Sequence, residues 1–151
     1  MELTTEAAQA FLAQPRIGTI AIERKGGAPL AIPIWYDYAP GGDLRVITPP
    51  GTFKAKLLRA AGRCTLVVDE MEPRIVFVSV ECDLVDELPP SKDHNRMMAT
   101  RYLSPEAVEG FVAAMPAEAL FVFFLGAFAA GAAFLVELVQ CLGQPRERLV
   151  V

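Results

Sequence analysis

The sequence ITPPGTFKAK at residues 47–56 joins the end of an expected strand to the start of an expected helix. Its Pro-Pro-Gly run at 49–51 breaks the strand, and Thr52 is a residue type that commonly caps helices. The first backbone N–H groups of a helix have no partner inside it and carry partial positive charge, so such a corner binds anions. We therefore predict an anion site here, to which Thr52 adds a hydroxyl donor.

Two lysines follow the expected cap. Lys54 and Lys56 place positive charges in the first helical turn, where cations oppose the helix macrodipole. A bound anion would remove that conflict. The alternative is that Lys54, Lys56 and Arg59 form a solvated face, because a short motif of this kind also occurs by chance.

The chain on both sides of this corner alternates apolar and polar residues, which predicts antiparallel β-structure. The expected strands run from Arg16 to a turn at 25–27, then over 29–38, 44–48, 63–69 and 74–85. Helices are expected at 4–13 and 53–60, and two more follow 89–90, the second beginning at 104–106. This mainly β (α+β) order fits a β-barrel with peripheral helices better than a parallel sheet.

Composition narrows the possible functions. The chain has 151 residues and a formal net charge of -4, and its basic residues are scattered, so we expect a single domain over 1–151 that does not bind nucleic acid. The N-terminus lacks the basic start and apolar run of a signal peptide. Cys64, Cys82 and Cys141 lack the spacing of a disulfide framework or zinc site, so we expect free thiols in a cytoplasmic protein.

A second candidate segment lies just before the corner. Pro33 interrupts an otherwise alternating strand, which suggests an edge or bulge where backbone groups are free to meet a ligand. Trp35 and Tyr36 follow it, and a planar heterocycle could lie against residues 33–35. The alternative is that Trp35 belongs to an ordinary core or interface.

Five segments together carry a resemblance to a known family. They are PRIGTIA at 15–21, PIWY at 33–36, LRVIT at 44–48, TFKAK at 52–56 and RCTLVVD at 63–69. Over residues 3–115 the chain resembles the pyridoxamine 5'-phosphate oxidase-like family of FMN-binding split barrels. The resemblance implies an antiparallel split β-barrel with peripheral helices, a homodimer, and FMN or a deazaflavin as cofactor.

The same resemblance implies roles for individual residues. Those expected to contact the flavin are Pro33, Ile34, Trp35, Ile47, Thr48, Thr52, Lys54, Lys56, Arg74 and Ser79. The residues at 52–56 would hold the phosphate, those at 47–48 would meet the ribityl chain or the ring, and those at 33–35 would face the isoalloxazine. Arg74 and Ser79 would reach the partner subunit's flavin, because the family places its cofactor sites at the subunit interface.

The chain departs from the family pattern in three places. Phe53 stands where the oxidase has an arginine beside the phosphate lysine, and Glu81 stands where many relatives have glycine. The C-terminal segment lacks the Trp- and Arg-bearing end of the oxidase. Oxidation of pyridoxamine 5'-phosphate is therefore not implied, and a general flavin reductase or oxidase is favoured.

Three functions are compatible with these patterns. The first is a flavin-dependent oxidoreductase acting on a small organic molecule, in which the cofactor carries the redox chemistry and no catalytic side chain is assigned. The second is a non-catalytic protein that binds a flavin, a deazaflavin or haem, and the third is a cofactor-free structural homodimer. His94 is expected on a helix surface, and the acidic residues at 83–87 are expected on a solvated edge without a metal.

The apolar run at 119–136 carries no charge and approaches the length that spans a bilayer. Its glycines and alanines make it only moderately hydrophobic, and basic anchors are missing before it. We therefore expect no membrane span. We expect instead a final barrel strand over 119–125, as the resemblance implies, followed by a helix buried at the dimer interface.

Overall fold

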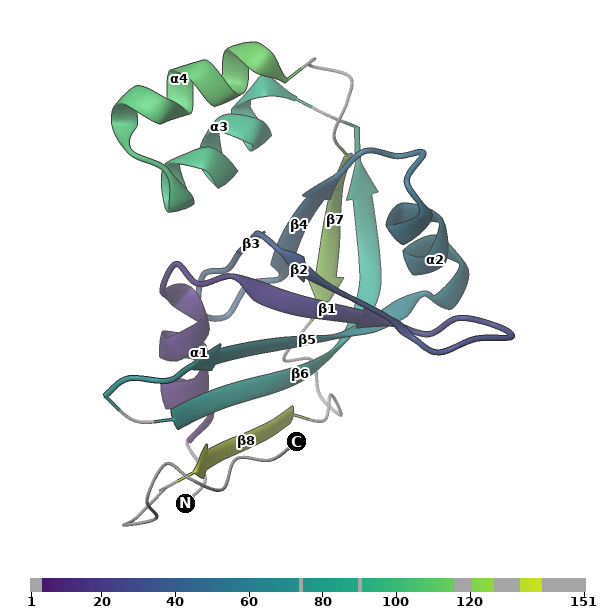
Figure 1. The fold of residues 1–151 in the computed structure, drawn as a ribbon, viewed down its shortest axis with the longest axis vertical. Helices are drawn as coiled ribbons and strands as arrows, with labels where there is room; N and C mark the ends of the chain where they lie inside the picture. The colour runs from purple at the N-terminus through teal and green to yellow at the C-terminus, as the bar shows by residue number, and fades with distance from the viewer. Residues whose placement is uncertain (1–3, 74, 90, 116–120, 127–133, 140–151) are drawn as a thin grey trace, which may run out of the picture.

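The computed structural model describes residues 4–73, 75–89, 91–115, 121–126 and 134–139 (Figure 1). In these ranges the helices are α1 (Thr5–Ala13), α2 (Phe53–Ala61), α3 (Lys92–Tyr102) and α4 (Pro105–Ala114). The strands are β1 (Gly18–Ile22), β2 (Leu30–Ile34), β3 (Tyr36–Asp37), β4 (Leu44–Thr48), β5 (Arg63–Glu70), β6 (Ile75–Leu88), β7 (Phe121–Gly126) and β8 (Phe134–Val139). The predicted strands and helices up to residue 115 are confirmed, except that the strand expected over 29–38 is divided in two.

The division of that strand closes the barrel. The antiparallel sheet has the order β2-β1-β5-β6-β7-β4-β3, so its two end strands are neighbours in the chain, separated by Trp35 alone. On one side of Trp35, Ile34 pairs with Gly18 of β1, and on the other side Tyr36 pairs with Val46 of β4. One segment thus leaves one end of the sheet and joins the other, and the predicted fold class is confirmed.

Alternation along the strands supplies the barrel core. The fully buried aliphatic side chains on the central strands include Ile20, Ile22, Leu44, Leu66, Val68, Val78 and Val80. Each such side chain contributes roughly 1.5–3 kcal/mol by leaving water, so the interior is the main source of stability. Cys64 and Cys82 are buried free thiols that lie directly opposite each other on β5 and β6. Hydrogen bonding to Cys64 and burial raise the pKa of the Cys82 thiol.

Local sequence sets the ends of the helix beside the corner. The hydroxyl of Thr52 caps α2 by accepting the Ala55 N–H at 3.3 Å. Gly62 ends α2 with φ at 67°, a left-handed conformation that glycine adopts at no steric cost. Both end signals are those that the sequence predicts.

The C-terminal segment differs from the expectation. The strand expected over 119–125 is confirmed across the described residues, where β7 lies between β4 and β6. The helix expected after it is wrong for Phe134–Val139, which form β8. Because β7 covers β6 only at 83–88, the edge of 75–80 would have unpaired backbone groups, and β8 pairs with those residues. No helix in the described part of the chain is long and apolar enough to cross a bilayer.

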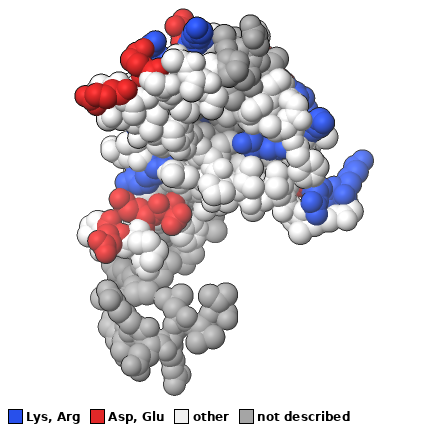
Figure 2. Space-filling model, turned by 45° about the horizontal axis from the view of Figure 1, so that its top comes forward, with Lys and Arg blue, Asp and Glu red and all other residues white. Residues whose placement is uncertain are grey.

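The helices α3 and α4 pack together at one end of the barrel (Figure 1). Figure 2 views the molecule with this end turned forward, and most of the face in this view is uncharged, with a basic side chain near its middle. Most of the Lys, Arg, Asp and Glu side chains in this view lie around its margin.

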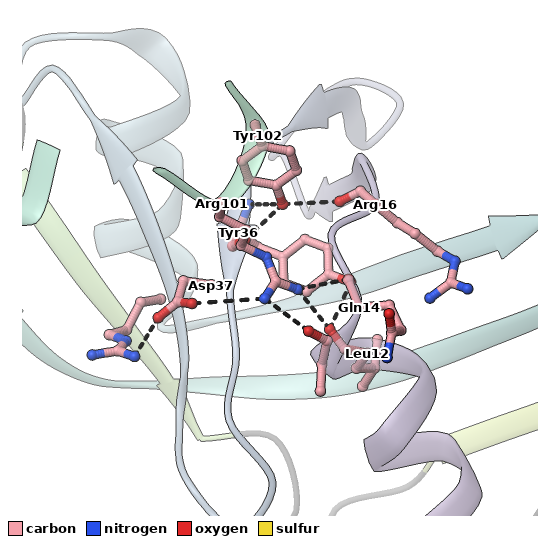
Figure 3. Close-up of polar contacts among 9 residues, drawn as sticks. Leu12, Gln14, Arg16, Tyr36, Asp37, Arg101 and Tyr102 are labelled. Atoms are coloured by element: carbon pink, nitrogen blue, oxygen red, sulfur yellow. Dashed lines mark hydrogen bonds and ion pairs between the residues drawn. The ribbon is translucent and has the colours of Figure 1, made fainter. Parts of the chain in front are cut away.

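The last turn of α3 holds two barrel segments together (Figure 3). The Tyr102 hydroxyl accepts the Tyr36 N–H at 3.0 Å and lies 2.6 Å from the Tyr36 carbonyl and 2.9 Å from the Arg16 carbonyl. The Arg101 guanidinium donates to the carbonyls of Leu12, Ala13 and Gln14 at 2.7–2.9 Å. These carbonyls lie at the end of α1, where the helix itself offers them no donor. Helix α3 is therefore bonded to α1 and to the strand that closes the barrel.

We expect Arg101→Ala to lower the free energy of unfolding by about 2–4 kcal/mol, because several carbonyls lose a charged donor together. Arg96→Ala is the matched control on the same helix. Arg96 forms an exposed pair with Glu109, and such pairs contribute about 0–1 kcal/mol. Urea unfolding measures both variants, and equal losses would contradict the role given to Arg101.

Alkaline pH tests the burial of Tyr36, whose hydroxyl donates to the Leu12 carbonyl at 3.0 Å. Burial raises the pKa of Tyr36 from 10.0 to about 12, so the folded state favours the neutral phenol. Its contribution to stability is complete below pH 10 and is lost as the pH rises through about 12. The stability advantage of the wild type over Tyr36→Phe should therefore fall by up to about 2.7 kcal/mol across this interval. An advantage that stays constant with pH in urea titrations would show that Tyr36 ionises freely.

Candidate functional site

A pocket of about 210 Å³ lies between the corner that begins α2 and the pair formed by α3 and α4. Its lining residues are Pro33, Ile34, Trp35, Ile47, Lys54, Asn95, Met98, Phe111 and Met115. Three separate parts of the chain therefore meet here: the segment that closes the barrel, the strand-to-helix corner, and the two helices at the barrel end.

Trp35 forms an aromatic wall of the pocket. Its ring stacks on Tyr102 with centroids 4.8 Å apart and planes at 15°, and it contacts Phe111 with centroids 5.7 Å apart. Pro33 lies beside it in β2, an end strand of the sheet order, which pairs with β1 and with no other of the described strands. The predicted edge position of Pro33 is confirmed. Trp35, which belongs to neither β2 nor β3, has its ring at the pocket and against Tyr102 and Phe111.

The start of α2 supplies backbone donors. The Thr52 hydroxyl donates to the Pro49 carbonyl at 2.8 Å and accepts the Ala55 N–H, so its hydrogen is used inside the turn. The Thr48 hydroxyl, almost fully buried, lies 3.3 Å from that of Thr52. Helix geometry leaves the N–H groups of residues 53 and 54 without an acceptor inside α2. The hydrogen-bond donors that this corner has free for an anion are therefore these two backbone N–H groups, because the Thr52 hydroxyl already donates to Pro49.

Lys54 brings a positive charge to the pocket wall. Its side chain is half-buried, and desolvation lowers the pKa of the ammonium. Within the part of the chain that the structure describes, no carboxylate pairs with it. A cation that is partly removed from water and lacks a counter-ion favours the binding of an anion.

Arg59 fixes the turn in front of these donors. It donates to the Pro50 carbonyl at 2.8 Å and forms an ion pair with Glu87 in which Nε and Oε2 lie 2.9 Å apart. The guanidinium of Arg59 lowers the pKa of the Glu87 carboxyl. Arg59 is exposed, as the solvated-face alternative expects, and its bonds connect the corner to β6.

The predicted site residues do not all meet in one place. Pro33, Ile34, Trp35, Ile47 and Lys54 line the pocket, and Thr48 and Thr52 lie just behind its corner. Lys56 is exposed and does not line it, because residues two apart on a helix lie about 200° apart around its axis. Ser79 lies within β6 and is not a lining residue, and Arg74 lies outside the described residues. Contact of Lys56 with the flavin phosphate, and of Arg74 and Ser79 with the partner subunit's flavin, stays a prediction.

Sequence reasoning missed the pocket residues on the two helices. They are Asn95, Met98, Phe111 and Met115. Asn95 and Met98 are one helical turn apart, which places them on one face, but the sequence does not say which partner that face meets. His94 does not line the pocket, and its Nδ1 lies 3.0 Å from the Ser91 hydroxyl. In the described ranges, the His, Cys, Asp and Glu side chains form no cluster that could hold a metal ion.

Solved structures share this architecture. An F420 reductase is 18% identical with a TM-score of 0.66 over 84% of this chain and 94% of its own. A putative pyridoxamine 5'-phosphate oxidase from Listeria innocua is 10% identical with a TM-score of 0.62 over 87% and 95%. HutZ, the haem storage protein from Vibrio cholerae, is 14% identical with a TM-score of 0.61 over 90% and 95%. The chain has their fold, a pyridoxamine 5'-phosphate oxidase-like split barrel.

Sequence comparison adds no closer assignment. No model of a protein family matches the chain, and no protein of described function is significantly similar to it in sequence. At these identities the structural likeness establishes the split barrel alone. The activity must therefore be argued from the pocket.

Thr52→Ala tests the capping role at the corner. Because the Ala55 N–H loses its acceptor, we expect the free energy of unfolding to fall by about 1 kcal/mol, while Thr52→Ser keeps the hydroxyl and most of the stability. Urea unfolding of the ligand-free protein gives both values. If alanine proves as stable as threonine, the hydroxyl does not cap the helix.

Proposed function

We propose that the pocket binds a phosphate-bearing flavin, either FMN or a deazaflavin, and that the protein is a flavin-dependent oxidoreductase acting on a small organic molecule. One observation carries the proposal. The half-buried ammonium of Lys54, which has no acidic partner among the described residues, lies in the same pocket wall as the start of α2. A phosphate at this corner would gain the backbone N–H groups, the helix field and a full positive charge.

The rest of the pocket fits the ring of such a cofactor. Its lining is mainly apolar and aromatic, with Pro33, Ile34, Trp35 and Phe111 on the sides. Flat heterocycles bind in pockets of this composition, where a few polar groups set the orientation. The anionic and the planar parts of a flavin phosphate would each meet a matching surface.

The size of the pocket supports a homodimer. Ligand pockets typically enclose about 300–1,000 Å³. The 210 Å³ formed by one chain is less than that, so one chain would enclose only part of a flavin. Phe53, beside Lys54 at the start of α2, is 53% exposed. A second copy of the chain that covers Phe53 would complete the pocket and remove this aromatic side chain from water.

The chemistry divides between cofactor and chain. When bound, a flavin supplies the electron or hydride transfer. Lys54 would bind the phosphate, Trp35 would fix the plane of the ring, and α3 and α4 would exclude water from one side. The described lining residues include no Asp, Glu or His, so Lys54 is the ionisable side chain among them, and its proposed role is to bind the phosphate.

Haem binding is the second candidate, because HutZ has the same fold and is a haem storage protein. Haem iron in proteins takes a His, Met, Cys or Tyr ligand. The sole histidine, His94, does not line the pocket, whereas Met98 and Met115 do. The pocket therefore offers thioether sulfur and no imidazole from this chain, which favours a flavin over haem.

Reconstitution tests the proposal. We expect FMN or F420 to raise the melting temperature and to quench the emission of Trp35, the single tryptophan of the chain. A protein that shows neither response to either cofactor contradicts flavin binding and supports a cofactor-free dimer, and haem added in parallel tests the second candidate. A cofactor that binds but never turns over with any reductant or acceptor would indicate a non-catalytic carrier.

Lys54→Ala should weaken FMN binding about 10–100-fold, because a charged hydrogen bond contributes about 1.5–3 kcal/mol. Lys25→Ala, in the exposed turn between β1 and β2, is the control and should bind as the wild type does. Since the pKa of Lys54 is lowered, affinity should fall with rising pH earlier than for an ordinary lysine. A comparable loss with Lys56→Ala would show that the phosphate also reaches the second lysine, and no loss with Lys54→Ala would contradict the proposed phosphate site.

A further inference from the structure

Asn95 has an unusual environment for an amide side chain. It lies in α3, is 1% exposed and lines the pocket. In the part of the chain that the structure describes, neither its Oδ1 nor its Nδ2 has a hydrogen-bond partner. Each such buried polar atom costs about 1–3 kcal/mol. An apolar residue of the same size would avoid this cost, so the position is poorly explained by packing.

Polar side chains at the start of α3 and at the strand-to-helix corner do have partners. The Ser91 hydroxyl accepts the His94 N–H at 3.2 Å and lies 3.0 Å from His94 Nδ1, and the Thr48 hydroxyl contacts that of Thr52. The other residues that line the pocket are apolar or aromatic except Lys54, and they include Met98 and Phe111. Hydrogen bonds are stronger in such a low-dielectric setting. An amide held there is available to a molecule that enters the pocket.

We propose that Asn95 is the hydrogen-bonding residue for the pocket's ligand and that it pairs with a lactam-type edge, a ring N–H beside a C=O. A side-chain amide presents a donor and an acceptor side by side, and its complement is an acceptor and a donor side by side. A carboxylate ligand would leave the Asn95 oxygen facing negative charge, and a purely apolar ligand would leave both groups unpaired. The inference rests on the proposed function of this pocket. It names the chemical group that Asn95 would bind there.

Two sources share this chemistry. The pyrimidine ring of a flavin carries a lactam edge, and so does a small cyclic amide bound beside a flavin. In either case two residues on different helices would bind the polar parts of the ligands. Lys54 on α2 would bind the anionic group, and Asn95 on α3 would bind the lactam edge. The experiment must therefore measure the cofactor and a second molecule separately.

The test uses Asn95→Leu, which keeps the number and branching of the side-chain heavy atoms and removes both polar groups. The ligand-free variant should unfold at the same urea concentration as the wild type or at a higher one, because buried unpaired groups are removed. FMN, titrated into the ligand-free protein by calorimetry, should bind the variant at least 10-fold more weakly if the edge is that of the cofactor. Arg96→Leu, the exposed neighbour on α3, is the control and should bind FMN as the wild type does.

A second arm adds uracil, a small lactam, to the FMN-loaded proteins. If FMN affinity is unchanged in Asn95→Leu but uracil binding is lost, the edge belongs to a second molecule. If neither FMN nor uracil binding depends on Asn95, the proposal is overturned. Asn95→Ala repeats both arms if the leucine variant does not fold.

The two proposals fail separately. Absence of flavin binding by the wild type overturns the proposed function and is read from the wild type alone. The Asn95 inference is then decided with uracil on the ligand-free proteins, where equal binding or no binding by wild type and variant overturns it. A marked loss of ligand-free stability in both Asn95 variants would also overturn it, because it would show that the amide serves the fold.

Discussion

The structure depends on one crossing of the chain, the passage from β2 to β3 through Trp35. Backbone pairing with β1 ends before this residue and pairing with β4 begins after it, so the sheet closes on itself there. The Tyr36 N–H at this crossing donates to the Tyr102 hydroxyl, and the ring of Trp35 stacks on that of Tyr102. The contact that closes the barrel therefore also sets α3 above the pocket. A change at Trp35 or Tyr102 affects closure, helix position and pocket shape together.

Much of this fold is readable from local sequence. Alternation predicts the strands, and Thr52 and Gly62 mark the ends of α2 because capping and left-handed turns depend on a few neighbouring residues. The helix expected after β7 is wrong because Phe134–Val139 pair with a vacant edge of β6, a condition set by residues far away in the sequence. For the same reason the sequence does not predict that Cys64 and Cys82 lie opposite each other, since this depends on the register of β5 and β6.

In the candidate site, too, some features follow from neighbouring residues and others depend on residues far away in the sequence. The corner at 47–56 is a continuous segment, and its role in the pocket follows from residue types and helix geometry. Asn95 has no sequence signal, because its burial and its lack of partners arise only when α3 packs against the barrel. Lys54 and Lys56 show, within one helix, how far the site can be predicted from the sequence. Both fit an anion motif by spacing, but the helical turn directs only Lys54 into this pocket, and Lys56 could meet a ligand only from another side.

The bonds that Arg101 and Tyr102 make to the barrel have a consequence for how a ligand is received. Helix α3, which lines the pocket, is bonded through the charged Arg101 side chain to the end of α1 and through the partly buried Tyr102 hydroxyl to β3. The pocket is thus preorganised on that side, and association would require little loss of conformational entropy from α3.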